Sequence, residues 1–450
     1  MKLMKSLLLG SAAGFAAVAG AQAADLPARK AAPVEFVRVC SQFGAGFFYV
    51  PGSDTCLKVS GRVRADYIWN EPLTRASNTT TFRARGYLAL DSFTPTDWGP
   101  LRATTRVYVT RDSGRGFNGN GVNLANVGNG AGSTNADVAL DWAYIQFAGI
   151  TAGRVAVSFF EFAPFGGVTY LGGGANGRGS DYGAIDALAY TATFGGGFSA
   201  TIAIEDGTER RAAALVNGGA TFLTTGVTAG NLNYAGHVMP DIVGRLDYTG
   251  PWGSAALTGA VHQIRTTGIF PAAGNAIGET DYGFAIQGGV KVNLPMLAPG
   301  DALFLQAAYA DGANSYTGWG ALGIGSQNLV GQAVITPDTV YDVLGNSHTT
   351  KTWSIVGGLL HYWTPTLRQG VAVAYGKHDA YGSFYDAAAL TVATNMIWTP
   401  VKGFDIGAEV GYQRLTDVPN IVYSPVNAPT SLFGLQKDGW FGRLRFQRDF

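Results

Sequence analysis

Three consecutive segments near the N-terminus alternate strictly between apolar and polar residues. They cover residues 57–69, 82–90 and 101–109. A period of two predicts β-strands, because successive side chains of a strand point to opposite faces. Arginines gather on the polar face of these strands, at Arg62, Arg64, Arg83, Arg85, Arg102 and Arg106. That face requires water, whereas the Leu, Val, Phe and Trp face does not, and the three segments alone leave open which face points inward.

The N-terminus indicates that the chain is exported. Residues 1–5 are basic, residues 7–19 are apolar with small side chains, and Ala21-Gln22-Ala23 matches a small-x-small cleavage site. This order is typical of a secretory signal peptide, so we expect the mature chain to begin at Ala24. An uncleaved anchor helix is the alternative, and the short apolar core disfavours it.

The composition after the signal peptide favours a membrane protein built from strands. The sequence contains no further run of 18 apolar residues, which excludes a helical membrane protein. Yet the chain is 47% hydrophobic and 14% charged, with 64 Gly, 25 Phe, 20 Tyr and 9 Trp. This is typical of a β-rich protein with many turns and one lipid-facing surface. The formal net charge of zero gives no indication of nucleic-acid binding.

Strand patterns continue to the C-terminus, and we count sixteen. They are predicted at residues 57–69, 82–90, 101–109, 138–147, 150–157, 188–194, 198–205, 242–248, 255–261, 284–292, 302–309, 353–362, 370–375, 390–398, 404–412 and 440–450. Their connections alternate between short turns and longer segments rich in Gly, Asn and Ser. Bacterial outer-membrane barrels have this alternation, with short periplasmic turns, long extracellular loops and an even number of strands. Within residues 138–147 the apolar side chains change from even-numbered positions to odd-numbered ones. A β-bulge or a protein-facing side is therefore expected there.

Closure of the sheet into a barrel determines which face of the strands contacts water. Backbone groups in lipid must all be hydrogen-bonded, so the sheet must close on itself. Sixteen strands enclose a water-filled channel. We therefore predict an all-β, 16-stranded antiparallel transmembrane barrel whose arginine face lines the pore. A soluble β protein with a solvated arginine face is the alternative. Tryptophans at or near strand ends predict an aromatic girdle, at Trp69, Trp98, Trp252, Trp363 and Trp398.

The two cysteines, Cys40 and Cys56, are expected to form a disulfide because the chain is exported. The bridge would tie the N-terminal segment to the first strand. We interpret the chain as a signal peptide at residues 1–23, a small periplasmic cap at residues 24–56 and a barrel at residues 57–450.

Several blocks of sequence resemble the porins of rhizobial-type alphaproteobacteria. The blocks are Ala24-Asp25-Leu26-Pro27, Val39-Cys40-Ser41, Gly44-Ala45-Gly46-Phe47, Tyr49-Val50-Pro51-Gly52, Asp54-Thr55-Cys56-Leu57-Lys58, Ala143-Tyr144-Ile145-Gln146-Phe147-Ala148-Gly149, Ala152-Gly153-Arg154, Gly357-Gly358, His361-Tyr362-Trp363-Thr364-Pro365 and the terminal Phe450. The resemblance implies a homotrimer of outer-membrane pores for small polar solutes, in contact with membrane lipids and lipopolysaccharide. It also implies that the third long loop folds into the lumen and that Phe450 is read by the barrel-assembly machinery.

The third long loop, residues 160–184, is expected to narrow the pore. It contains many glycines together with Glu161, Arg178 and Asp181. If the loop lies against the barrel wall, Glu161 and Asp181 would face the arginines, and opposed charges would orient passing polar solutes. Exposed loop carboxylates, or a local pair between Arg178 and Asp181, are the alternatives.

Enzymatic functions find no support in the sequence. It contains no Gly-x-Ser-x-Gly and no His-Glu-x-x-His motif, and its five histidines lack ligand spacing. We therefore expect no enzyme, no metal and no cofactor. Two Gly-x-Gly-x-x-Gly matches, at residues 172–177 and 318–323, lack a strand–turn–helix context. The alternatives that remain to a general diffusion pore are a substrate-specific channel, for example for sugars, and an adhesion barrel with a plugged lumen.

Overall fold

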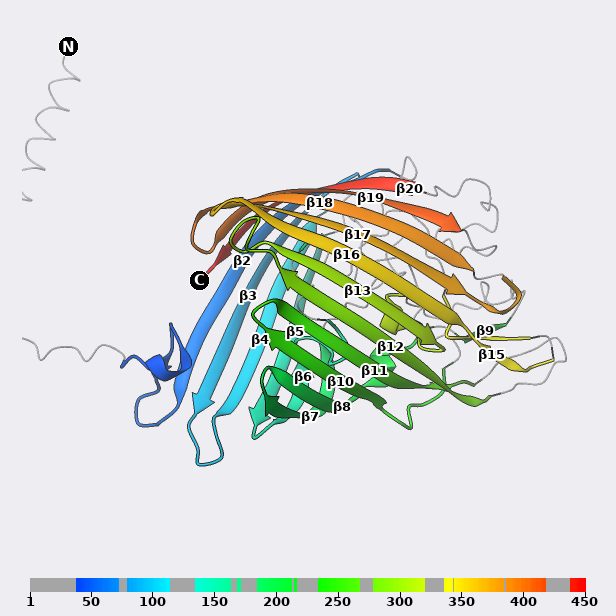
Figure 1. Ribbon diagram of the computed structural model, residues 1–450, viewed down its shortest axis with the longest axis horizontal. Helices are drawn as coiled ribbons and strands as arrows, with labels where there is room; N and C mark the ends of the chain where they lie inside the picture. The colour runs from blue at the N-terminus through cyan, green and yellow to red at the C-terminus, as the bar shows by residue number, and fades with distance from the viewer. Residues whose placement is uncertain are drawn as a thin grey trace, which may run out of the picture.

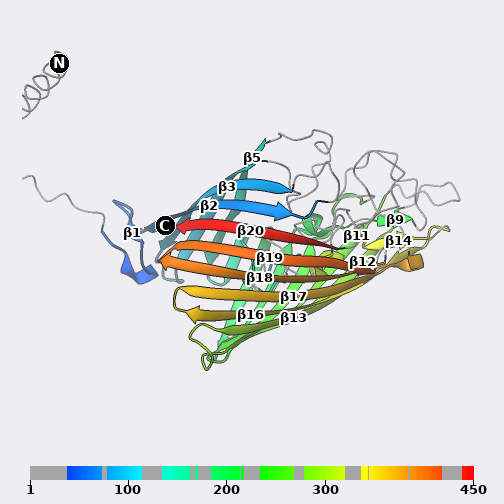
Figure 2. The same ribbon diagram turned by 90° about the horizontal axis from the view of Figure 1, so that it is seen from above.

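The computed structural model describes residues 38–72, 79–113, 134–162, 168–170, 184–212, 214–216, 234–267, 278–319, 336–342, 344–383, 386–417 and 438–450. Sixteen antiparallel strands formed by these residues pair in a closed ring (Figure 1). The ring closes because β20, the last strand, pairs with β2 as well as with β19 (Figure 2). No helix among the described residues is long and apolar enough to cross a membrane.

Each predicted strand corresponds to one strand of the ring. The ring consists of β2 (Cys56–Asn70), β3 (Thr80–Thr94), β4 (Leu101–Ser113), β5 (Thr134–Phe147), β6 (Ile150–Val155), β7 (Ile185–Gly195), β8 (Phe198–Glu205), β10 (Asp241–Gly250), β11 (Gly253–Arg265), β12 (Thr280–Asn293), β13 (Ala302–Asp311), β16 (Lys351–Thr364), β17 (Leu367–Asp379), β18 (Ala387–Val401), β19 (Phe404–Asp417) and β20 (Asp438–Asp449). Most strands extend past their predicted bounds, whereas β6 ends two residues early.

The outer face of the barrel is apolar. On β2, the exposed large side chains are Val59, Val63, Tyr67 and Trp69, and the arginines between them point inward. The five tryptophans predicted for the girdle are all at least 39% exposed. The arginines of β2 therefore lie on the inner face of the barrel, and their role in lining a water-filled pore stays a prediction.

Short turns join the strands at one end of the barrel, which we call the short-turn end. The turn between β5 and β6 shows why two residues suffice. Ala148 and Gly149 both have positive φ, at 48° and 84°. Two such residues form the tight turn that matches the twist of a hairpin. The other end, which carries the long connections, is called the long-loop end.

The expected β-bulge lies in β5. Arg106 of β4 is paired with Trp142, and Val107 is paired with Leu140, so Asp141 is the extra residue. A bulge changes the face to which the following side chains point. Leu140 before it and Ile145 after it are both exposed on the outer face, which explains the change of parity.

The N-terminal segment packs against the short-turn end of β2. It contains η1 (Ser41–Phe43) and β1 (Phe48–Tyr49), which pairs with the start of β2. The predicted disulfide between Cys40 and Cys56 is confirmed, with the Cα atoms 6.0 Å apart. Stacked and edge-on aromatic rings complete this cluster, from Phe43, Phe47 and Phe93.

At the long-loop end, two loops combine into a second small sheet. Its strands are β9 (Ala214–Val216), β14 (Thr339–Tyr341) and β15 (Ser347–Thr349). The same two loops contain the short 3-10 helices η4 (Gly207–Arg210) and η6 (Asn314–Thr317). A third short helix, η7 (Tyr381–Ser383), lies in the loop between β17 and β18. The carboxylate of Asp338 is fully buried and accepts hydrogen bonds from Ala212 N, Tyr234 Oη and Asn314 N. Burial raises the pKa of Asp338 although these bonds oppose the shift. One carboxylate thus joins the loop after β8 to the loop after β13.

Candidate functional site

The six predicted arginines line one side of the lumen, and we call them the arginine wall. Four of them form ion pairs with aspartates on neighbouring strands. Arg83 Nε lies 2.7 Å from Asp112 Oδ1, and Arg102 Nε lies 2.9 Å from Asp91 Oδ1. The other two pairs are Arg62 with Asp449 and Arg106 with Asp141. The wall is therefore a ladder of opposite charges rather than a purely basic surface.

Two members of the wall, Arg64 and Arg85, have no carboxylate partner among the described residues. They occupy directly opposite positions on β2 and β3. Arg64 Nε donates to Gln447 Oε1 at 3.2 Å, and Arg85 Nε donates to Thr110 Oγ1 at 2.7 Å. With six arginines and four aspartates, the wall keeps a formal charge of 6 − 4 = +2. Arg64 and Arg85 are the source of that excess.

The first part of the third loop lies against the inner faces of β10, β11 and β12. The carbonyl oxygen of Phe160 accepts hydrogen bonds from Thr258 Oγ1 at 2.9 Å and from Gln287 Nε2 at 2.8 Å. Arg245 Nη1 donates to the backbone oxygens of Phe159 and Glu161. The side chains of Arg245, Thr258 and Gln287 point inward. Those of Thr258 and Gln287 are almost fully buried, because the loop covers them.

A later part of the same loop, residues 168–170, contacts β18, β19 and β20. Val168 O accepts a hydrogen bond from Asn395 Nδ2 at 3.0 Å. Tyr170 N donates to Glu409 Oε2 at 2.6 Å, and Tyr170 O accepts from Arg443 Nη1 at 3.2 Å. Because β13, β16 and β17 separate these strands from β10–β12, the two described parts of the loop contact different stretches of the inner wall.

Small residues on the inner wall make room for the loop. Phe162 packs into a cluster with Ala256, Ala302 and Val356. A Cβ atom at Gly289 would lie 2.4 Å from the Phe162 ring. Residues 159–162 and 168–170 thus cover parts of the inner wall between β10 and β20. The arginines of β2, β3 and β4 that form ion pairs keep 19–30% of their side-chain surface exposed.

The structure places Glu161 differently from the sequence-based expectation. Its carboxylate does not face the arginine wall but is 2% exposed, and Oε1 lies 3.0 Å from Arg210 Nη2. Arg210 comes from η4 and also donates to Ser158 Oγ at 2.6 Å. The expectation fails because a buried cation from another loop is nearer than the wall. Arg178 and Asp181 lie outside the described residues.

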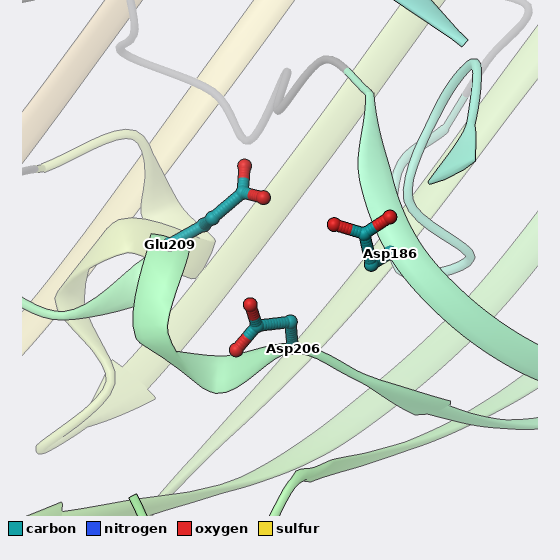
Figure 3. Close-up of side chains that lie close together, drawn as sticks. All are labelled: Asp186, Asp206 and Glu209. Carbon is teal, nitrogen blue, oxygen red and sulfur yellow. The ribbon is translucent and has the colours of Figure 1, made fainter. Parts of the chain in front are cut away.

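A cluster of carboxylates lies near the long-loop end, where Asp186, Asp206 and Glu209 point toward one another (Figure 3). A guanidinium group joins two of them: Arg154 Nη1 lies 2.6 Å from Glu209 Oε1 and 3.2 Å from Asp186 Oδ2. This single guanidinium offsets one of the three negative charges of the cluster.

Sequence reasoning missed several residues that position the site. Asp91, Asp112 and Asp449 share the parity of the arginines, so the alternation contains the signal that would have found them. Asp141 alternates with the outward Val138 and Leu140 as well, but its contact with Arg106 depends on the bulge. Arg210 comes from a loop, where periodicity gives no information.

Residues 25–437 of the sequence match the Porin subfamily. The chain belongs to this porin family. The porin is 31% identical over 452 residues to Porin Omp2b of Brucella canis and of Brucella abortus (strain 2308), with 99% of both chains covered in each case. The sequence-based resemblance to alphaproteobacterial porins is thereby confirmed, and the porin is an outer-membrane diffusion channel.

Two solved structures share the fold of the porin. The outer membrane channel DcaP of Acinetobacter baumannii matches with a TM-score of 0.56 and 16% identity, covering 90% of the porin and 99% of that chain. Salmonella typhi OmpF, in a complex with daunomycin, matches with a TM-score of 0.53 and 14% identity, covering 90% and 100%. Both support the closed 16-stranded architecture.

Proposed function

We propose that this porin is a general diffusion pore whose passage runs between the arginine wall and the third loop. The observation that carries the proposal is the asymmetry of the lumen. The inner faces of β10–β12 and β18–β20 are contacted by residues 159–162 and 168–170, while the paired arginines of β2–β4 stay partly exposed. Small polar solutes pass along the exposed side.

The charge pattern of the wall favours polar solutes and gives a modest preference for anions. Alternating arginines and aspartates order water, and an apolar solute would have to displace that water. Rings or rows of charge in a pore also set ion preference. Because four of the six wall arginines are paired with aspartates, the net positive charge of the arginine wall comes from Arg64 and Arg85.

We further infer that the mature chain consists of a periplasmic cap at residues 24–56 and a barrel at residues 57–450, and that three copies associate. Membership of the porin family supports the trimer. The partners proposed are outer-membrane lipids, lipopolysaccharide and the assembly machinery, which would read Phe450. No nucleic-acid partner is proposed.

Planar-bilayer recording of the purified protein tests the general pore against its alternatives. A general pore gives a steady ohmic current that added sugars do not block, and its reversal potential in a KCl gradient has the sign of a weak anion preference. Concentration-dependent block by a sugar would instead establish a substrate-specific channel. The absence of any conductance from correctly folded protein would establish a plugged barrel.

The residue assignment has a separate test in the same recordings. Replacing Arg83, Arg85, Arg102 and Arg106 by glutamine should move the reversal potential toward cation preference. An unchanged reversal potential would remove the arginine wall from the conducting path.

A further inference from the structure

The strands that carry the arginine wall also present aromatic side chains to the lumen. Four half-buried rings share the inward direction of the arginines: Tyr87, Tyr108, Trp142 and Tyr144. Tyr87 on β3 and Tyr108 on β4 are direct cross-strand partners, so they are neighbours on the wall. Beyond Tyr108, the next position is Ala139 on β5, whose methyl group is too short to cover the ring. Part of the lumen surface is therefore aromatic.

Guanidinium groups lie against these rings. Arg85 Cζ lies 4.4 Å from the centroid of the Tyr108 ring. The ring of Tyr87 has two such neighbours, Arg106 at 4.6 Å and Arg62 at 5.1 Å. A guanidinium over an aromatic face is attracted by the quadrupole of the ring, which favours one orientation of the planar group. Among the described residues, Tyr108 has one such contact and Tyr87 has two, so Tyr108 is the less covered ring.

Two cations beside the tyrosines are not neutralised by a carboxylate of the described residues. Arg64 and Arg85 are direct cross-strand partners, and Arg85 precedes Tyr87 by two residues, or roughly 7 Å along β3. Each arginine donates a hydrogen bond through Nε to a neutral side chain, and the Nη atoms of both have no partner in the described parts of the chain. Like charges directly opposite one another destabilise a sheet. A bound anion relieves that repulsion.

We propose that Arg64, Arg85 and Tyr108 form a low-affinity binding site for small aromatic carboxylates on the passage through the pore. The inference rests on the proposed diffusion pore and names a class of solute that dwells in it. The carboxylate accepts hydrogen bonds from the Nη atoms of Arg64 and Arg85, and such charge-assisted bonds are short and strong. The ring of the solute packs against Tyr108, one row further along the wall.

Two other classes of solute fit only half of this surface. An inorganic anion pairs with the two cations but makes no use of the ring. A neutral sugar packs against a ring but leaves two like charges facing each other. An aromatic carboxylate satisfies both features, because offset or edge-on packing of two rings adds to the attraction between the charges.

Planar-bilayer recording of the purified mature porin tests the site, with benzoate as the probe. Added benzoate should reduce the single-channel current in a concentration-dependent way, because an occupied site obstructs the passage. Cyclohexanecarboxylate has the same charge and nearly the same size but no aromatic ring. Its half-blocking concentration should be at least threefold higher than that of benzoate. Equal block by the two acids would overturn the aromatic assignment and leave a seat for any carboxylate.

A pair of double variants tests the cations. Arg64→Gln/Arg85→Gln should raise the half-blocking concentration of benzoate at least tenfold. The matched control, Arg102→Gln/Arg368→Gln, removes the same charge from two inner-face arginines that are each paired with an aspartate. It should change the half-blocking concentration less than twofold. Equal losses in the two double variants would show that the field of the whole lumen, rather than a site, attracts benzoate.

Single variants test the ring. Tyr108→Leu should raise the half-blocking concentration of benzoate at least threefold, whereas Tyr108→Phe keeps the ring and should match the unaltered porin. Tyr144→Leu removes another inner-face ring, from β5, and should have no effect on the block. If Tyr108→Leu blocks like the unaltered porin, or if Tyr144→Leu has the same effect as Tyr108→Leu, Tyr108 is not part of the site.

The outcomes also separate this inference from the proposed function. The current without benzoate reports on the pore, and saturation-transfer NMR of benzoate with the detergent-solubilised porin reports on binding without a current. A conducting porin that benzoate neither blocks nor binds overturns the site and leaves the diffusion pore standing. A porin that binds benzoate with the expected variant effects but carries no current keeps the site and loses the pore. Absence of both binding and current overturns both.

Discussion

Arg106 on β4 forms an ion pair with Asp141 on β5, although the register pairs Arg106 with Trp142 instead. The bulge in β5 produces this arrangement, because it brings two successive residues of one strand to a single residue of the other. The guanidinium carbon of Arg106 lies 3.3 Å from the centroid of the Trp142 ring as well. One arginine of the pore wall is therefore held by a carboxylate and an indole together.

Asp141→Asn should increase the anion preference of the pore. The substitution keeps the size of the side chain but leaves Arg106 without its carboxylate partner, so the formal charge of the arginine wall rises from +2 to +3. The reversal potential in a KCl gradient measures the change. Asp97→Asn, in the exposed turn between β3 and β4, changes the net charge equally and should have no effect. Equal shifts in both variants would show that Asp141 does not act on the permeating ions.

Arg64→Gln and Arg83→Gln should have the same effect on selectivity but different effects on stability. Each removes one positive charge from the wall and shifts the pore toward cations. Only the second takes a guanidinium away from a carboxylate, since Arg83 is paired with Asp112 and both are less than 20% exposed. The expected cost is about 1–3 kcal/mol in the free energy of unfolding. Thermal unfolding in detergent measures it, and Arg83→Gln/Asp112→Asn should recover part of the loss. Equal stability of the two single variants would contradict the reasoning.

Arg210→Gln should loosen the third loop and enlarge the passage. The guanidinium of Arg210 is buried, contacts Glu161 of that loop and Ser158 just before it, and lies 4.0 Å from the centroid of the Tyr316 ring on η6. Breaking a buried ion pair costs about 3–5 kcal/mol in general. Single-channel conductance and its noise should both increase, and larger sugars should enter in liposome-swelling assays.

A control for Arg210 comes from the same end of the barrel. Arg265→Gln removes the same charge from an arginine whose hydrogen bond, to Gly236 O, is exposed. It should leave the conductance unchanged. If Arg210→Gln has the same conductance as the unaltered protein, the backbone hydrogen bonds of the third loop suffice to hold that loop in place.

Reduction of the Cys40–Cys56 disulfide should release the N-terminal segment and leave the barrel intact. The chain-entropy model gives about 3 kcal/mol for a loop of this size, and we assign this contribution to the local stability of residues 40–56 rather than to the barrel. β2 itself remains held by its pairing with β3 and β20. Protease cleavage within residues 41–55 should therefore become faster in dithiothreitol, with an unchanged unfolding midpoint. A lowered midpoint would show that the bridge supports the barrel as well.

Phe450→Ala should reduce the amount of folded protein in the outer membrane without weakening the barrel. The backbone of Phe450 exchanges two hydrogen bonds with Gly61, at 2.9 and 3.0 Å, and alanine preserves both. Refolding into detergent should therefore be unaffected while assembly in cells is impaired. Phe446→Ala, on the outer face of the same strand, provides the control. Equal assembly of both variants would argue against a recognition role for Phe450.

The candidate site was only partly predictable from the sequence. Alternation placed all six arginines correctly on the inner face, because side-chain direction in a strand depends only on parity. It did not reveal how Arg62 pairs with Asp449, since that contact joins the first and last strands of the ring. Glu161 shows the same limit within a loop, where its partner Arg210 is supplied by another long connection.

The sequence by itself determined the number of strands, which side chains of each strand point inward, the alternation of turns and loops, and the disulfide. Each of these follows from local pattern or from the chemistry of an exported chain. Only the tertiary structure decided which charges neutralise one another and which wall the third loop covers. Those outcomes depend on closure of the ring, on a one-residue bulge and on contacts between loops far apart in the chain, and no periodicity encodes them.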